Sequence, residues 1–116
     1  MKPSLLLRLE GLIVFTAALY SYGYVNGNWI LFALLILAPD VSMLGYLKDV
    51  KLGALGYNVV HTYVLPATLF VVSYFAGFDL GLALAIIWIA HIGMDRLLGF
   101  GLKYPTEFKD THLNRV

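Results

Sequence analysis

The chain contains no cysteine among its 116 residues, and only 13% of its residues are charged. The absence of cysteine excludes disulfide bonds, thiolate metal sites and cysteine nucleophiles. A soluble domain normally carries about 25% charged residues, so water is not the main solvent of this chain. The net charge of +1 leaves no basic stripe for a phosphate backbone, and we expect no nucleic-acid partner.

Long apolar runs dominate what remains. Hydrophobic residues make up 60% of the chain, and a membrane-spanning helix needs about 20 of them in succession. Short connections with turn-forming residues separate the runs, so consecutive helices should be antiparallel neighbours. The sequence predicts an all-α integral membrane bundle of four antiparallel transmembrane helices, Leu5–Tyr24, Trp29–Leu47, Gly53–Phe75 and Asp79–Phe100.

The lysines and arginines indicate the orientation of these helices. All eight fall on one side of the predicted membrane, whereas the other side carries only Asp79. By the positive-inside rule, both termini should be cytoplasmic. We expect residues 1–116 to form one domain, of which residues 101–116 are a short cytoplasmic tail.

Four ionisable side chains interrupt the apolar runs, namely Asp40, His61, His91 and Asp95. An ionised group inside a bilayer costs about 2.5–3.5 kcal/mol even on lenient insertion scales, so each needs a partner or a purpose. At about 1.5 Å per residue, Asp40 and His61 lie ~10–12 Å from the cytoplasmic surface, and the other two lie close to that depth. The similar depths predict that the four side chains share one polar site in the cytoplasmic half of the membrane.

Local spacing supports the shared site. His91 and Asp95 are four residues apart and lie on one helix face. Asp40 follows Pro39, which removes a main-chain donor and can open the second helix locally. The opened main chain must be satisfied from the interior of the bundle, which favours an inward position for Asp40.

Two aspartates and two histidines form a plausible ligand set for a divalent metal ion, either zinc, iron or manganese. An open coordination position could carry a water acidified towards neutral pH for hydrolysis. Glu10 and Tyr104 are the candidate catalytic residues, available for proton transfer or orientation. The substrate partner would be a membrane lipid or another amphiphile.

Several motifs resemble a family of small bacterial integral membrane proteins called domain of unknown function 4260. The resemblance covers essentially the whole chain and implies a multi-pass protein of the bacterial inner membrane, with no activity attached. It is carried by Arg8-Leu9-Glu10-Gly11, Ala38-Pro39-Asp40, Tyr57-Asn58 with His61-Thr62-Tyr63, His91 through Arg96, Gly101 through Pro105, and Thr111-His112-Leu113.

A weaker likeness is to the membrane-bound metal-dependent hydrolases related to YdjM. It rests on the order of Pro39-Asp40, His61-Thr62, His91 with Asp95, Gly101 and Tyr104-Pro105. Two ligands of that family are replaced here by Ser42 and Met43, and Asn58 stands near the place of a third. The likeness therefore implies one metal ion at most.

Two other functions fit the same residues. Buried Asp and His chains also build ion or proton sites in transporters, and a path through four short helices would require a homo-oligomer. Alternatively, His61 and His91 could ligate haem from both sides, although haem would leave Asp40 and Asp95 without a role.

Overall fold

The computed structural model describes residues 2–105, 109 and 111–115, and this part of the chain is almost entirely helical. Its elements are α1 (Pro3–Tyr24), α2 (Trp29–Leu35), the 3₁₀ helix η1 (Ala38–Leu47), α3 (Val50–His61), α4 (Val64–Ala76), α5 (Asp79–Leu98) and α6 (His112–Arg115). Four helical segments are long and apolar enough to cross a membrane, which confirms the predicted fold class. α2 with η1 forms the second segment, and α3 with α4 forms the third.

Side chains at the helix ends explain most of the boundaries. Asn28 caps α2 by accepting hydrogen bonds from the amides of Ile30 and Leu31. Asp49 caps α3 by accepting from the Leu52 amide at 2.6 Å, so this helix begins at Val50 rather than at the predicted Gly53. Gly99 follows α5 in the left-handed region (φ 97°), so the helix ends at Leu98, two residues before the predicted end at Phe100.

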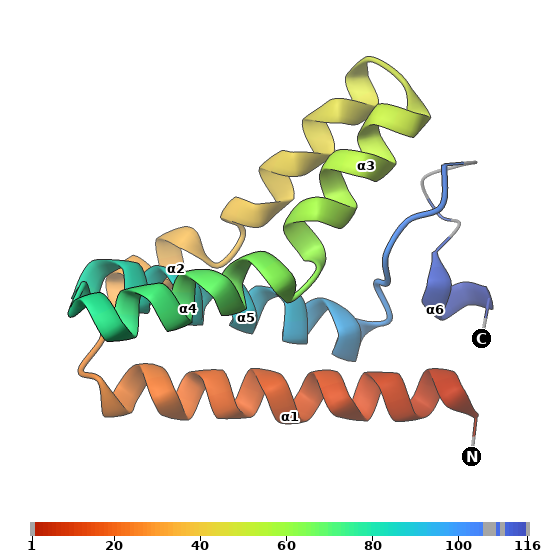
Figure 1. Cartoon of the computed structure of the whole chain (residues 1–116). Coiled ribbons are helices and arrows are strands. Elements are labelled where there is room, and N and C mark those ends of the chain that lie inside the picture. Colours follow the sequence, from red (N-terminus) through yellow and green to blue (C-terminus); the bar gives the residue numbers. More distant parts are fainter. Residues whose placement is uncertain (1, 106–108, 110, 116) are drawn as a thin grey trace.

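α5 is the central helix of the molecule. It packs against α1 on one side and α4 on the other (Figure 1). The closest approach joins α1 and α5 at Gly11 and Gly93, where a Cβ atom on Gly93 would lie 2.8 Å from the Phe15 nitrogen. Small residues at such crossings allow membrane helices to pack closely.

The second and third spans are each broken near their middle. In Figure 1, the hairpin of η1 and α3 leans away from α1, α4 and α5. Pro39 lies just after the first break, at Leu37, and Pro66 lies just after the second, at Thr62 and Tyr63. Proline removes a helical donor and clashes with the preceding turn. The spans are therefore kinked rather than straight, and the breaks release main-chain carbonyls near the predicted site.

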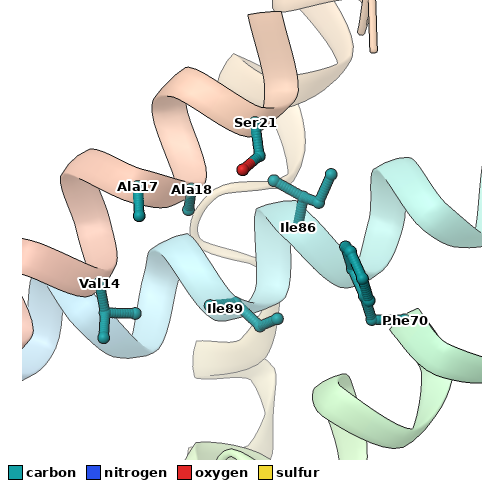
Figure 2. Close-up of a pocket in the computed structure, with 7 residues that line it drawn as sticks. All are labelled: Val14, Ala17, Ala18, Ser21, Phe70, Ile86 and Ile89. Carbon is teal, nitrogen blue, oxygen red and sulfur yellow. The ribbon is translucent and has the colours of Figure 1, made fainter. Parts of the chain in front are cut away.

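An apolar pocket lies on the face of α5 where α1 and α4 approach it. Figure 2 shows Ala17, Ala18 and Ser21 of α1 facing Ile86 of α5, with Phe70 of α4 closing the other side. The pocket has a volume of about 190 Å³. Among the described residues, no ionisable side chain lines this pocket. The ionisable residues of α5 that were predicted as site residues, His91 and Asp95, lie outside it.

Candidate metal centre

The four predicted ligands converge on one point between η1, α3 and α5. One nitrogen or oxygen atom from each residue lies within 4.8 Å of the corresponding atoms of the other three. His61, His91 and Asp95 are buried, whereas Asp40 is partly exposed. The site was predicted from depth and from local spacing in the sequence, and the structure confirms that these four residues lie together.

The distances between the ligand atoms suit a small divalent cation. The Nε2 atoms of His61 and His91 are 3.0 Å apart. From His61 Nε2 the carboxylate oxygens of Asp40 and Asp95 lie at 3.3 and 3.4 Å, and from His91 Nε2 they lie at 3.1 and 3.2 Å. A tetrahedral zinc with bonds of about 2.0–2.2 Å separates its ligands by about 3.3–3.6 Å. These five edges therefore fall within a few tenths of an ångström of what the ion requires.

Main-chain carbonyls fix the orientation of both imidazole rings. His61 Nδ1 lies 2.9 Å from the Tyr57 carbonyl, and His91 Nδ1 lies 2.5 Å from the Ile36 carbonyl. A carbonyl can only accept, so each ring donates its Nδ1 proton, and in a neutral ring Nε2 is then an unprotonated acceptor. Two Nε2 lone pairs and two carboxylate oxygens then face one another, and such a set of acceptors requires a cation or added protons at its centre.

The helix break at Leu37 supplies one of these carbonyls. In a continuous α-helix the amide of Asp40 would bond to Ile36, but here it bonds to the Leu37 carbonyl at 3.0 Å. The Ile36 carbonyl is thereby released to accept from His91. The prediction that the opening at Pro39 is satisfied from the interior is confirmed, and the group that satisfies it is the imidazole of His91, one of the four candidate ligands.

Side chains of α5 bind the carbonyls released by the second break. Trp88 Nε1 donates to the Val60 carbonyl at 2.7 Å, and the Arg96 guanidinium donates to the His61 carbonyl at 3.1 Å. Trp88, His91 and Asp95 follow one another at helical spacing on the same face of α5. One helix therefore supplies two ligands and holds α3, which carries a third, in place.

Tyr57 belongs to the site although it was not predicted as a site residue. Its ring stacks on the His61 imidazole with centroids 3.7 Å apart, and its hydroxyl lies 3.5 Å from Asp95 Oδ2. Tyr57 and His61 are one helical turn apart, and this spacing is the sequence signal that could have identified it. The tyrosine orients one ligand through its ring and another through its hydroxyl.

Lys103 is the second residue that sequence reasoning missed. It is only 5% exposed, and its ammonium group lies 4.7 Å from the centroid of the Tyr57 ring. Burial lowers the pKa of Lys103, and the negative charges of Asp95 and Asp40 act in the opposite direction. The sequence places Lys103 in a polar tail, which gave no indication that it is buried. Its burial results from the tail folding back onto α3, where the Asn58 side chain binds the Lys103 main chain.

A cavity of about 300 Å³ opens beside the cluster. Both aspartates line it, and neither histidine does. It is lined by Asp40, Met43, Tyr57, Asp95, Phe100 and Lys103. The site is therefore accessible to water or a small group on the carboxylate side.

The two predicted catalytic residues lie outside this lining. Glu10 is exposed on α1, and it is not in the group of four ligands. Tyr104 is partly buried, with the Arg115 guanidinium 3.5 Å from the centroid of its ring. Their roles in proton transfer stay predictions, and the cavity instead presents Tyr57 and Lys103 beside the ligands.

The geometry does not suit haem between the two histidines. Axial imidazoles on opposite faces of a haem iron would place their Nε2 atoms about 4 Å apart, with the macrocycle between them. Here the two atoms are 3.0 Å apart, and a carboxylate oxygen of each aspartate lies within 3.4 Å of both. No space for a macrocycle separates the rings.

Comparison with known proteins assigns the family. The sequence model of DUF4260, a domain of unknown function, matches residues 4–116. The chain belongs to the DUF4260 family. No curated protein and no solved structure matches the chain, so the likeness to YdjM-related hydrolases stays a prediction.

Proposed function

We propose that this chain is a membrane-embedded, metal-dependent hydrolase that acts on a lipid or another amphiphile. The observation that carries the proposal is the convergence of two Nε2 lone pairs and two carboxylate oxygens, with both Nδ1 protons already engaged by carbonyls. With both rings neutral, the only donor that reaches these four acceptors among the described residues is the Tyr57 hydroxyl, at 3.5 Å from Asp95 Oδ2, and a divalent cation stabilises them most directly. A purely structural cluster would instead pair donors with acceptors.

The donor set favours zinc, iron or manganese. Imidazole nitrogen and carboxylate oxygen suit these ions, and the two ring orientations are fixed by hydrogen bonds of the kind that support metal-ligating histidines. The ion would act as a Lewis acid and lower the pKa of a bound water. The two aspartates balance the charge of a divalent ion, and Tyr57 orients His61 and Asp95 from the side.

The open cavity beside the cluster favours a hydrolytic metal site over a purely structural metal site, which would be closed to solvent. It reaches the cluster from the carboxylate side, so water and a scissile ester could approach there. In the overall reaction, the water oxygen forms a bond to the ester centre, the bond to the leaving alcohol breaks, and a proton passes to the alcohol oxygen. Glu10 and Tyr104 are retained as candidate proton-transfer groups from the sequence.

A proton site is the second candidate, and one distance favours it. With His61 Nε2 and His91 Nε2 only 3.0 Å apart, a single proton on one ring could be shared with the other. The aspartates would then stabilise the imidazolium, as in proton relays within membranes. Transport by this route would require a homo-oligomer, because one copy has only four spans.

We further propose that the protein spans the bacterial inner membrane with both termini in the cytoplasm. The proposal rests on the eight lysines and arginines, which the order of the spans assigns to one side. The metal site would then open towards the cytoplasmic half of the bilayer.

Elemental analysis tests the proposed function directly. The protein is purified in detergent with an affinity tag that contains no histidine, because a histidine tag would itself bind metal. We expect about one zinc, iron or manganese ion per chain, and release of alcohol or headgroup from a panel of lipid esters that stops on chelation and returns with the ion. Asp95→Asn is the matched variant, since it keeps the side-chain volume and removes one charged ligand.

The contrary result is equally clear. A protein that stays metal-free after incubation with each of the three ions, and whose thermal unfolding does not change with them, is not a metal-dependent hydrolase. A pH-dependent uptake of one proton by that metal-free protein would then assign the cluster to the proton site.

A further inference from the structure

The η1–α3 hairpin is a tightly packed unit that leans away from the rest of the molecule (Figure 1). Its two helices pack on each other more closely than on α1, α4 or α5. A Cβ atom on Gly45 would lie 3.0 Å from the Gly53 Cα atom, and a Cβ atom on Gly53 would collide with the Tyr46 ring. Because the two helices meet this closely, they can move only together, as one rigid body.

Both helix breaks that attach this hairpin lie beside a ligand of the Asp/His cluster. The first break, at Leu37, precedes Asp40 by three residues. The second break, at Thr62 and Tyr63, begins immediately after His61. Hinge motions are absorbed at the ends of helices, where a few φ and ψ angles can change without loss of packing. The hairpin therefore has the form of a lever whose pivot lies at the cluster.

The four ligands are divided equally between the hairpin and α5. Asp40 and His61 belong to the hairpin, whereas His91 and Asp95 belong to α5. Three of the five short distances cross between the two parts. His61 Nε2 lies 3.0 Å from His91 Nε2 and 3.4 Å from Asp95 Oδ2. Asp40 Oδ1 lies 3.1 Å from His91 Nε2. An ion would join the two parts, whereas the acceptors alone repel one another across the pivot.

The polar cavity beside the cluster is shared by the same two parts. Three of its lining residues belong to the hairpin, and the other three belong to α5 and the segment that follows it, namely Asp40, Met43 and Tyr57, and Asp95, Phe100 and Lys103. A rotation of the hairpin about its breaks would therefore change the width of the cavity. In the proposed orientation the hairpin lies in the cytoplasmic half of the bilayer, so a widened cavity would admit an amphiphile from the lipid.

The hydrogen bonds that α5 makes to the hairpin main chain are close to the pivot. Trp88 and Arg96 donate to the carbonyls of Val60 and His61, the last two residues of α3. Asn58, one turn earlier, binds the main chain of the tail rather than α5. α3 has 12 residues, so at about 1.5 Å per residue its far end lies about 18 Å from the pivot. A rotation of about 10° would move that end by about 3 Å.

We infer that the η1–α3 hairpin is a hinged arm, which the bound ion closes onto α5 and which opens the polar cavity when the ion leaves. The inference rests on the proposed function and gives the ion of that site a second role. With the ion present, ligands from both parts share one positive charge, and closure is favourable. Without it, the facing acceptors favour separation. The ion thus completes the site and also controls access to it.

Distances between two spin labels test the hinge. Because the chain has no cysteine, each introduced thiol is unique. Lys48→Cys labels the far end of the hairpin, and Ile13→Cys labels α1 at a position that is 68% exposed. Double electron–electron resonance is measured in lipid nanodiscs at constant pH, first without metal and then with zinc. Zinc is diamagnetic, and such sites bind it at least as tightly as manganese or ferrous iron.

We expect zinc to narrow the distribution of distances between the two labels and to shift its maximum by about 3 Å or more. Removal of the zinc with a chelator should restore the broad distribution in the same sample. Val72→Cys on α4, paired with Ile13→Cys, is the control within the part that does not rotate, and its distance should be equal in both states. In the hairpin pair, His91→Ala removes a ligand on α5 and should abolish the response to zinc.

An unchanged distribution in protein that holds one zinc per chain overturns the hinged arm, although the proposed function stands. An equal shift in His91→Ala also overturns it, because zinc would then act outside the cluster. If His91→Ala does not fold, reversal by the chelator still decides the question in protein with all four ligands. If the protein binds none of the three ions, the proposed function fails first, and elemental analysis shows this before any distance is measured.

Discussion

His61 and His91 point their Nε2 atoms at each other across 3.0 Å, while the Nδ1 atoms contact the carbonyls of Tyr57 and Ile36. One imidazole comes from the end of α3 and the other from α5, 30 residues further along the chain. Two neutral rings in this arrangement repel each other through their lone pairs. The fold therefore maintains an arrangement of acceptors that becomes favourable only when a cation or protons are added.

Removal of either imidazole should abolish stoichiometric metal binding. His61→Ala and His91→Ala each open the coordination sphere, whereas the α1–α5 packing does not depend on them. We expect less than about one tenth of the wild-type metal content by elemental analysis, with the helical circular dichroism largely unchanged. His112→Ala is the matched control, because that histidine lies in the tail, and it should keep the metal.

Asp40→Asn should weaken metal binding less than either histidine change. An amide oxygen can still coordinate, but it carries no charge, and Asp40 is the most exposed of the four ligands. Competition with a chelator of known affinity measures the difference. If both histidine variants unfold and the wild type contains no metal, the cluster is structural and the hydrolase proposal is wrong.

The residues of the site could be predicted from the sequence because the cost of burying a charged group can be judged for each residue from the apolar run around it. Asp40, His61, His91 and Asp95 stand out from their apolar runs, and helical rise gives their depth. The sequence did not predict the position of Lys103, whose burial depends on Asn58 reaching across from α3. Nor did it predict the lean of the η1–α3 hairpin, since two prolines mark breaks without setting their angles.

Pro39→Ala should lower metal affinity without touching a ligand. Alanine permits the second span to continue as an α-helix, so the Asp40 amide could bond to the Ile36 carbonyl and displace His91 from it. Loss of such a supporting hydrogen bond typically costs about 10–100-fold in metal affinity. A metal titration measures the change.

Pro3→Ala is the control for the proline effect. Pro3 is the first residue of α1, where a missing amide has no helical partner to lose. We expect its metal affinity to equal that of the wild type. Equal affinity in Pro39→Ala would show that the helix break does not position His91.

Gly93→Ala should destabilise the packing of α1 on α5. A Cβ atom at this position would lie 2.8 Å from the Phe15 nitrogen and 3.0 Å from the Gly11 carbonyl oxygen, and both are main-chain atoms. Overpacking of this kind costs about 1–3 kcal/mol. Unfolding by titration with a denaturing detergent measures the loss.

Gly23→Ala is the control for Gly93→Ala, because it adds the same methyl group to α1 at a position where there is space for it. The new Cβ would lie 3.6 Å from the Trp29 ring, which is an ordinary contact. We expect a gain of about 0.5–1 kcal/mol, because alanine favours the helix over glycine. A similar loss in both variants would contradict the assignment of the Gly11–Gly93 crossing as a close contact between α1 and α5.

Acid should release the folded tail. The Leu102 amide donates to His112 Nδ1 at 2.8 Å, which requires an unprotonated nitrogen. Burial lowers the pKa of His112 below its ordinary 6.5, and the positive charge of Arg96 lowers it further. The released tail therefore binds a proton more readily than the docked tail.

The sign of the pH effect follows from this difference. Docking is fully stable above pH 6.5 and weakens as the pH falls below it, by at most about tenfold per pH unit for one proton. Hydrogen exchange of the Leu102 amide, corrected for its intrinsic rate, measures docking. His112→Asn offers an oxygen near the position of Nδ1 that does not titrate, so its protection should not change between pH 8 and pH 5.

Cysteine labelling tests the orientation of the spans, and the absence of native cysteine makes each introduced thiol unique. Asn26→Cys lies between α1 and α2, and Phe78→Cys lies between α4 and α5. On intact bacterial cells, a membrane-impermeant maleimide should label both of these positions. Lys48→Cys, beside the turn between η1 and α3, should react only after the cells are opened, because lysine and arginine are retained on the cytoplasmic side. Labelling of Lys48→Cys on intact cells would reverse the orientation and place the Asp/His cluster, with the cavity beside it, in the outer half of the membrane.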